Sequence, residues 1–256
     1  MTLDVVAQAR SVRLRLSGEL WLFVAPRHRL EQVEIHHDGT ATLGHLVEAL
    51  GVPLTEVGAL LAGSVAVSPA QRPPAGVAVE VRPVRRPQQV PGWSEQFLLD
   101  VHLGTLARRL RLLGLDTAYR NDVDDDALIE QAQCQRRLLL TQDRGLLRRR
   151  ALWAGAYVHG AQTTDQLTDV LKRFAPALAP FTRCTTCNGE VNPVPKQEVA
   201  HQLQPGTRRY YQAYARCRCC GQVYWHGAHS RRLDAIITMA RSVRDKAATS
   251  CGHEKA

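Results

Sequence analysis

The first third of the chain alternates hydrophobic and polar residues at the two-residue period of β-strands. Ser11–Leu16 and Val77–Val81 follow this alternation, and Leu20–Val24 is a short apolar run, so we predict three strands there. Between them, Thr42 precedes apolar residues at helical spacing that end at Gly51, which predicts a capped helix. The sequence therefore predicts a small domain that mixes strands with one helix.

The middle of the chain instead alternates short apolar runs with helical patterns. From Leu103 to Leu113, leucines repeat at 3-4-3 spacing on one helix face, whereas Arg108, Arg109 and Arg111 fall outside that face. Strands that alternate with helices form a parallel sheet with helices on both faces, so we predict an α/β domain. Its predicted strands are Phe97–Leu99, Asp116–Tyr119, Arg137–Thr141 and Ala156–His159.

Changes in composition mark the borders of the predicted domains. Prolines and arginines interrupt every pattern at Pro83–Pro91, which predicts a linker. Most cysteines lie after residue 180. We predict a first domain over 1–86, a linker over 87–96, the α/β domain over 97–180, a cysteine-containing domain over 181–240 and a flexible tail over 241–256.

Positive charge is concentrated near the C-terminus. Residues 181–256 hold 12 Lys and Arg against 5 Asp and Glu, so they contribute +7 of the net charge of +9. This excess favours a polyanionic partner such as nucleic acid. No apolar stretch approaches the length that spans a bilayer, so no membrane partner is predicted. The odd number of cysteines and the lack of a secretory leader predict a reduced, cytoplasmic protein.

Acidic residues lie at the carboxyl ends of the predicted parallel strands. In parallel sheets, active sites usually lie at these strand ends. Asp100 follows the first predicted strand of the α/β domain, Asp143 follows the third, and Asp125 and Asp126 begin a helix between them. Carboxylates bind Mg²⁺ or Mn²⁺, which can neutralise phosphate charge and activate water. For each residue the simpler interpretation stays open, since Asp also caps helices and turns.

Four of the seven cysteines form two CxxC pairs. Cys184 and Cys187 make the first pair, Cys217 and Cys220 make the second, and a glycine follows each pair closely. Such pairs let four thiolates reach one tetrahedral ion at about 2.3 Å, so we predict a structural Zn²⁺ site. Cys219 leaves the register of the second pair open, and disulfides are the alternative that a reducing cytoplasm disfavours.

Longer stretches of the sequence resemble a family of RNases. FLLDVHLGTLARRLRLLGLDTAYRNDVDDDALIEQA, with RLLLTQDRGLL after it, resembles the PIN-like RNase domain of the mut-seven C-terminal type. DGTATLGHLVEALGVPLTEVG resembles a ubiquitin-like β-grasp domain attached to certain RNases, and GQVYWHGAHSRRL resembles the end of the family's zinc ribbon. The resemblance implies a ubiquitin-like β-grasp domain, a PIN-like parallel sheet and a zinc ribbon, in that order.

The resemblance also implies which residues act. It places metal-binding, catalytic acids at Asp100, Asp125 and Asp143, with Asp126 as a fourth candidate, and it implies Mg²⁺ or Mn²⁺ as the catalytic cofactor. Gln142 departs from the family pattern, in which a basic residue commonly precedes the acid. Arginines near the acids and near the cysteines are candidates for binding RNA: Arg108, Arg109, Arg144, Arg208, Arg209, Arg231 and Arg232.

Together these features predict a metal-dependent ribonuclease, with a structured RNA such as tRNA, cut near a single-stranded end, as the expected substrate. The ubiquitin-like domain is expected to dock a protein partner, because its last strand continues into the chain and cannot supply the free Gly-Gly end of a sulphur carrier. Two alternatives remain. The chain could be a zinc-ribbon RNA adaptor with an inactive PIN-like core, or a hydrolase of small phosphate compounds that uses the same acids.

Overall fold

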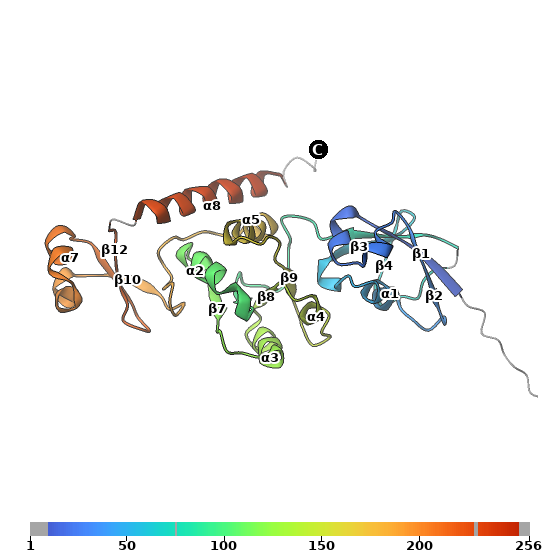
Figure 1. Ribbon diagram of the computed structural model, residues 1–256, viewed down its shortest axis with the longest axis horizontal. Coiled ribbons are helices and arrows are strands. Elements are labelled where there is room, and N and C mark those ends of the chain that lie inside the picture. The colour runs from blue at the N-terminus through green and yellow to red at the C-terminus, as the bar shows by residue number, and fades with distance from the viewer. Residues whose placement is uncertain (1–9, 75, 228–229, 251–256) are drawn as a thin grey trace, which may run out of the picture. The chain divides into compact units, whose positions relative to one another are not determined.

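The computed structural model describes residues 10–74, 76–227 and 230–250 (Figure 1). By proximity of their Cα atoms, these residues form two compact units. The N-terminal unit contains the residues up to Arg85 together with Asp143–Tyr157. The C-terminal unit contains Arg86–Gln142 and the residues from Val158 onward.

The N-terminal unit is built on a five-stranded sheet in the order β2-β1-β5-β3-β4. β1 and β5 are parallel, and the other neighbours are antiparallel. This mixed sheet, with one helix against it, confirms the predicted β-grasp fold. The strands are β1 (Arg10–Leu16), β2 (Val33–His37), β3 (Val57–Ala62), β4 (Val65–Val67) and β5 (Val79–Pro83).

The predicted helix of this unit is α1 (Leu43–Ala49). Thr42 caps it, since its Oγ1 accepts a hydrogen bond of 3.3 Å from the amide of His45. Gly51 follows the helix with φ 106°, where a Cβ atom would lie 2.5 Å from the carbonyl oxygen of Phe23. Only glycine satisfies both the backbone angle and this close approach.

One strand prediction in this unit is wrong. Most of Leu20–Val24 belongs to the 3-10 helix η1 (Gly18–Leu22), and the second strand of the sheet is β2. The buried residues Leu20, Phe23 and Val24 are three and four positions apart, which is helical spacing that a short apolar run conceals. β2 shows the strand pattern instead, because its side chains alternate between the core and solvent.

Residues 143–157 pack with the N-terminal unit, although the sequence places them inside the α/β domain. They contain α4 (Arg144–Leu147) and the predicted last strand, β9 (Gly155–Tyr157), which contacts η3 (Leu54–Glu56). The amide of Tyr157 donates a 2.8 Å hydrogen bond to the buried carboxylate of Glu56, and its ring meets that of Phe23 edge-on at 5.2 Å.

The C-terminal unit starts with a parallel sheet in which β6 pairs with β7 on one side and with β8 on the other. Figure 1 shows α2 and α5 above these strands and α3 below them, which confirms the predicted layers. The elements are β6 (Phe97–Leu99), η4 (Val101–Leu103), α2 (Gly104–Leu112), β7 (Thr117–Tyr119), α3 (Asp125–Gln135), β8 (Leu138–Thr141) and α5 (Thr163–Phe174).

The leucine stripe of α2 is the core of this sheet domain. Leu103, Leu106, Leu110 and Leu113 are fully buried, as the 3-4-3 spacing predicts. Burying each such side chain stabilises the fold by about 1.5–3 kcal/mol. Arg111 is buried as well, which the sequence pattern did not predict, because the chain after residue 180 covers it.

The cysteine-containing region folds as a three-stranded antiparallel sheet in the order β10-β11-β12, which is compatible with the predicted zinc ribbon. Its hydrophobic core is small and consists mainly of Val199, Tyr214 and Val223. The elements are β10 (Val191–Val194), α6 (Lys196–Val199), η5 (Ala200–Gln202), α7 (Pro205–Tyr210), β11 (Tyr214–Cys217) and β12 (Val223–Trp225).

The last element is the long helix α8 (Ser230–Ser250), which contacts α5. Residues 241–250, expected in a flexible tail, form its second half, and residues 251–256 lie outside the described part of the chain. Ile237 and Ala240 are buried three positions apart, so one face of the helix packs against the protein. No helix among the described residues is long and apolar enough to cross a membrane.

Candidate active site and cysteine cluster

Asp100 is the most buried of the predicted acids. It follows β6 directly and is only 6 % exposed. Its Oδ1 accepts a 2.5 Å hydrogen bond from the amide of Val101, and its Oδ2 accepts one of 2.6 Å from Oγ1 of Thr141 at the end of β8. Two neighbouring strands therefore fix the orientation of this carboxylate at their carboxyl ends.

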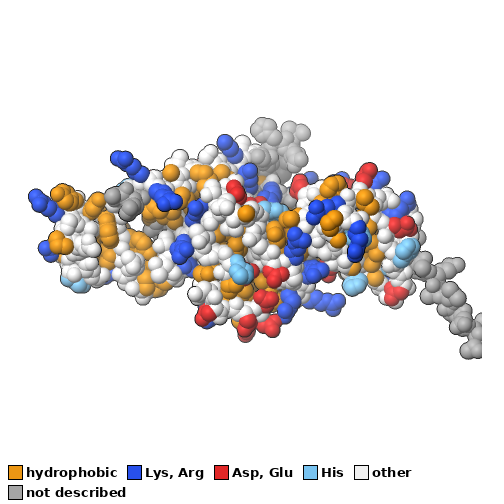
Figure 2. Space-filling model, viewed as in Figure 1, with side chains coloured by type: hydrophobic (Ala, Val, Ile, Leu, Met, Phe, Trp, Pro, Cys, Tyr) orange, Lys and Arg blue, Asp and Glu red, His pale blue; other side chains and the backbone are white. Residues whose placement is uncertain are grey.

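The acids before and within α3 lie on an exposed turn, where Figure 2 shows acidic side chains gathered. Asp124 is the N-cap, since its Oδ1 accepts a 2.8 Å hydrogen bond from the amide of Ala127. The capping interpretation therefore holds for Asp124. Asp125 and Asp126 occupy the first turn of the helix, and both are exposed.

Asp143 also caps a helix. Its Oδ1 accepts hydrogen bonds from the amides of Gly145 (2.6 Å) and Leu146 (3.3 Å), so it begins α4 two residues after the end of β8. Its side chain is exposed. Gln142 before it uses Nε2 to donate to the carbonyl of Gly160, 2.9 Å away. Asp143 thus has a structural task in the N-terminal unit besides the metal-binding role expected of it.

The described residues contain one group of three or more metal-ligating side chains close enough to share an ion, and it is the cysteine cluster. Its sulfur atoms all lie within 4.8 Å of one another. Cys184 and Cys220 approach to 3.6 Å, and Cys187 and Cys217 to 3.4 Å. Four sulfurs at about 2.3 Å from one tetrahedral ion would be about 3.8 Å apart, so the cluster fits zinc. Among the described residues of the C-terminal unit, Asp100, Asp125 and Asp126 form no such group, and Asp143 belongs to the N-terminal unit.

The cluster resolves the register of the second pair in favour of Cys217 and Cys220, and the described cysteines form no disulfide. Burial raises the pKa of Cys184, but hydrogen bonds from Tyr224 Oη at 3.0 Å and from backbone amides outweigh it and lower this pKa to about 6. Burial raises the pKa of Cys187 to about 12. A thiolate is the species that binds zinc, so the Tyr224 hydroxyl favours the ligand form of Cys184.

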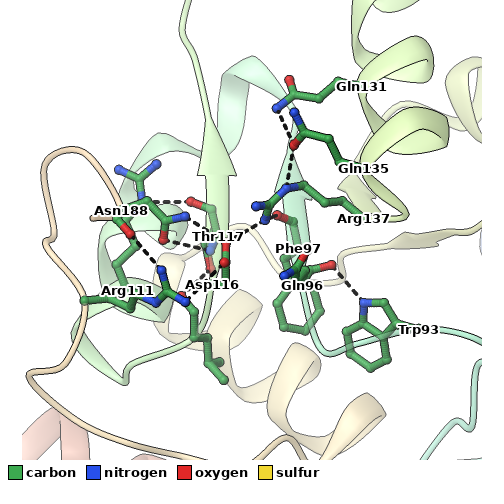
Figure 3. Close-up of polar contacts among 12 residues, drawn as sticks. Trp93, Gln96, Phe97, Arg111, Asp116, Thr117, Gln131, Gln135, Arg137 and Asn188 are labelled. Atoms are coloured by element: carbon green, nitrogen blue, oxygen red, sulfur yellow. Dashed lines mark hydrogen bonds and ion pairs between the residues drawn. The ribbon is translucent and has the colours of Figure 1, made fainter. Parts of the chain in front are cut away.

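Arg111 joins the sheet domain to the first CxxC pair, called here the first knuckle (residues 184–188). Figure 3 shows this arginine beside Thr117 and Asn188. Its Nε donates to the carbonyl of Thr117 at 2.8 Å, and its Nη1 donates to the carbonyls of Thr185 (3.3 Å) and Thr186 (2.8 Å). Burial lowers the pKa of Arg111, while the nearby thiols of the cluster act in the opposite direction.

Asn188 joins the same knuckle to β7 through its side chain (Figure 3). Its Oδ1 accepts from the amide of Thr117 at 2.9 Å, and its Nδ2 donates to Asp116 at 2.8 Å. Asp116 also pairs with Arg137 at 2.6 Å and with Arg183 at 3.2 Å. Burial raises the pKa of Asp116, but hydrogen bonds from Arg137 and Asn188 outweigh it and lower this pKa. These hydrogen bonds and ion pairs connect the first knuckle to β7, at the edge of the parallel sheet.

Comparison with models of known protein families shows to which family the chain belongs. The family model for the Mut7-C RNAse domain matches residues 95–237, more than half of the chain, and the model for the Mut7-C ubiquitin domain matches residues 9–89. The chain belongs to the Mut7-C RNase family. The order of the two matches confirms the predicted resemblance and gives the chain a ribonuclease-type domain. Searches of curated proteins and of solved structures gave no match.

The arginines predicted to bind RNA lie on several elements of the chain. Those of α2 already contact threonines, since Arg108 donates to Thr105 at 3.3 Å and Arg109 to Thr164 at 2.9 Å. Figure 2 shows basic side chains over α7 and α8. The exposed members of the predicted set are Arg108, Arg144, Arg208, Arg209, Arg231 and Arg232.

The sequence analysis missed two residues around Asp100. Thr141 ends the apolar run RLLLT, and a polar residue there, opposite the residue after β6, was a signal for a partner of the acid. Tyr119 donates a 2.9 Å hydrogen bond to the carbonyl of Val101. Its ring also lies where a Cβ atom on Gly104 would stand, 2.5 Å from the hydroxyl oxygen. No sequence pattern indicates this contact between the end of β7 and the start of α2.

Proposed function

We propose that the chain is a Mg²⁺- or Mn²⁺-dependent ribonuclease that hydrolyses RNA phosphodiester bonds. The observation that carries the proposal is the placement of Asp100 within the ribonuclease-type domain. This carboxylate is nearly buried, lies at the carboxyl ends of parallel strands and is held by Thr141 and by the amide of Val101. A rigidly held acid at this edge of the sheet is typical of an active site.

The proposed metal ligands are Asp100, Asp125 and Asp143, with Asp126 as a fourth. Carboxylate oxygens are the ligands that Mg²⁺ and Mn²⁺ prefer, so the donor chemistry fits. When bound, the ion would neutralise charge on the phosphate and make water a stronger nucleophile. The chain's own contribution is to orient the acids. Thr141 and Val101 donate one hydrogen bond to each oxygen of Asp100, which leaves an acceptor position on both.

The arginines near the acids are proposed to hold the RNA backbone. Arg144 follows Asp143 directly, and Arg108 lies on α2, the helix that begins after Asp100 and η4. Guanidinium groups bind phosphate oxygens through two parallel hydrogen bonds. In this proposal the arginines position the scissile phosphate, while the carboxylates supply the charge that binds the cation.

The ribbon is proposed to hold structural Zn²⁺ through its four clustered cysteines and to bind RNA. Four protein ligands leave no open position on the ion, so this site does not hydrolyse RNA itself. Exposed arginines beside exposed Tyr210 suit unpaired bases and phosphates. We therefore keep a structured RNA such as tRNA, cut near a single-stranded end, as the proposed substrate. Reduced thiols are required, which supports a cytoplasmic setting.

The ubiquitin-like domain is proposed to bind a protein partner, because its last strand continues into the chain and cannot supply the free Gly-Gly end of a sulphur carrier. It also has a structural task, because residues 143–157, which include Asp143, pack with it. Glu56 and Phe23 contact Tyr157 within that unit. Removal of residues 1–86 is therefore expected to disturb the segment that carries Asp143.

One observation favours a second candidate function. The four cysteines form a cluster that fits zinc, and a structural zinc site needs none of the carboxylates. A zinc-ribbon RNA adaptor with an inactive PIN-like core would need the cysteines alone. The two candidates differ in whether the purified protein cleaves RNA.

The deciding experiment incubates purified protein with total RNA, with and without added Mn²⁺, and sequences the new ends. The proposal predicts cleavage only with Mg²⁺ or Mn²⁺ and products that carry 5′-phosphates and 3′-hydroxyls, because water attacks the phosphate. Attack by the ribose 2′-hydroxyl would leave a cyclic phosphate instead. Cyclic ends, or full activity without either ion, would contradict the proposal, and RNA binding without cleavage would favour the adaptor.

A further inference from the structure

The ribbon carries a surface hollow of about 1050 Å³ beside the second CxxC pair. It is lined by residues of β10 and β11, by the turn Cys219–Gly221 and by Gln202 of η5. The polar side chains that line it include Asn192, Arg216 and Arg218. Neither the cysteine cluster nor the predicted RNA-binding set uses these three residues.

This hollow, called here the ribbon cleft, is lined by polar groups on one face of the ribbon sheet. Asn192 lies directly opposite Arg216 in the antiparallel pair, and Arg218 follows two residues later. Directly opposite residues, and residues two apart, share a face. With its amide oriented to accept, Oδ1 of Asn192 lies 3.0 Å from Nη2 of Arg218 and also contacts its Nε. The amide and the guanidinium are thus held together.

The charge around the cleft argues against a phosphate as its main ligand. Arg216 already pairs with Glu198 of α6 at 3.2 Å, and Cys217 and Cys220 are among the residues that line the cleft. A carboxylate and thiolates beside two guanidinium groups leave little net positive charge. Amide and guanidinium groups are, however, the side chains that hydrogen-bond to the edges of bases.

We propose that the ribbon cleft binds the edge of an unpaired base of the RNA, whereas the exposed Arg208 and Arg209 of α7 bind phosphates. This assignment rests on the proposed function, since it takes RNA as the ligand. The ribbon would then bind RNA at two places with different roles. The cleft contributes preference among bases, and the arginines of α7 contribute affinity that does not depend on sequence.

The test compares two double variants of the full chain that remove the same charge from the same ribbon. R216Q/R218Q alters the cleft, and R208Q/R209Q is the matched control. Both are made in a D100N background so that the RNA stays intact. Fluorescence anisotropy measures their binding to labelled oligo(A), oligo(C) and oligo(U) at several salt concentrations, and zinc content shows that the ribbon is folded. N192A, which leaves the charge unchanged, is measured in the same way.

The D100N protein is expected to prefer one homopolymer by about fivefold or more, the lower end of what one bidentate base contact gives. R216Q/R218Q and N192A should remove that preference. R208Q/R209Q should keep it, weaken binding to all three RNAs and reduce the salt slope by about 1.4, or about 0.7 per lost phosphate contact. A preference that survives in both cleft variants, or two double variants that behave alike, would overturn the assignment.

Failure of the proposed function is seen separately, in the cleavage assay of the unmodified protein. Cleavage by that protein together with an unchanged base preference in the cleft variants would refute the cleft alone. No binding of any homopolymer at low salt would overturn the cleft and the proposed RNA-binding role of the ribbon together.

Discussion

In the sequence, the β-grasp domain precedes the sheet domain and the zinc ribbon follows it, but different forces stabilise these two domains. The β-grasp core includes fifteen buried hydrophobic residues, whereas that of the ribbon has three. The ribbon instead has four clustered cysteines and a polar network to the parallel sheet, in which Arg111 and Asn188 bind residues of β7. A domain with so little apolar surface to bury depends on a metal and on its neighbour for stability.

The match to the Mut7-C RNase domain runs from residue 95 through to 237, so it spans the sheet domain and the ribbon together. Asn188 of the first knuckle accepts a hydrogen bond from a backbone amide of β7, and Arg111 of α2 donates one to a backbone carbonyl of the knuckle. The sheet domain and the ribbon therefore satisfy polar groups of one another. The β-grasp domain matches a family model of its own, over residues 9–89. The comparison therefore predicts that the loss of zinc affects the ribbon and β7 but leaves the β-grasp core intact.

The largest effect is expected from C184S, which removes a zinc ligand. Structural zinc contributes about 10–16 kcal/mol to the folding of small zinc domains, so the variant should lose its zinc and the ordered ribbon. Hydrogen exchange measured by mass spectrometry should show faster exchange over residues 184–225 and over β7, with unchanged exchange in the β-grasp domain. C134S, which alters an exposed cysteine outside the cluster, is the control. Uniform loss of protection across the chain would refute the comparison.

The converse variant is L14A in the β-grasp core. Leu14 is fully buried in β1, and truncation to alanine should lower the free energy of unfolding of this domain by about 2–5 kcal/mol. Thermal unfolding should show an earlier transition for the N-terminal unit, while the zinc content stays unchanged. Loss of zinc from L14A would show that the two flanking domains do not fold independently.

A smaller effect is expected from R111M, which removes the buried guanidinium from the first knuckle while keeping an unbranched side chain. The carbonyls of Thr185 and Thr186 lose their donors, and positive charge near the thiolates is lost. Residues that support metal ligands in this way change metal affinity by about 10–100-fold. Competition with a chelating dye should show weaker zinc binding by about that factor, whereas R208M, at an exposed site of the same ribbon, should bind zinc normally. Equal affinities in both variants would contradict the role given to Arg111.

Much of this architecture could be predicted from the sequence because the signals are local. The spacing of Cys184 and Cys187 and of Cys217 and Cys220 defines the cluster, and the leucine stripe of α2 defines a buried face. Predictions failed where distant segments decide the outcome. Arg111 falls outside the stripe of α2, yet it is only 4 % exposed because the first knuckle covers it.

In the candidate active site, too, contacts between distant segments could not be predicted from the sequence. The position of Asp100 after a buried strand could be read from the sequence, but its contact with Thr141 depends on the pairing of β6 with β8. Residues 143–157 are a further case, because packing against Glu56 and Phe23 groups them with the N-terminal unit. The catalytic roles of Asp100, Asp125, Asp126 and Asp143 stay predictions.

The central claim, that Asp100 helps to bind a catalytic cation in a ribonuclease, is tested most directly by D100N. Asparagine keeps the shape of the side chain and can still accept from Val101 and contact Thr141, so the fold should be preserved. It lacks the charge that holds a hard cation. The measurement is the rate of cleavage of an end-labelled RNA in Mn²⁺, with RNA binding and thermal stability measured in parallel. The account predicts a fall in rate of about 1000-fold or more with unchanged binding and stability; cleavage at the wild-type rate would contradict it.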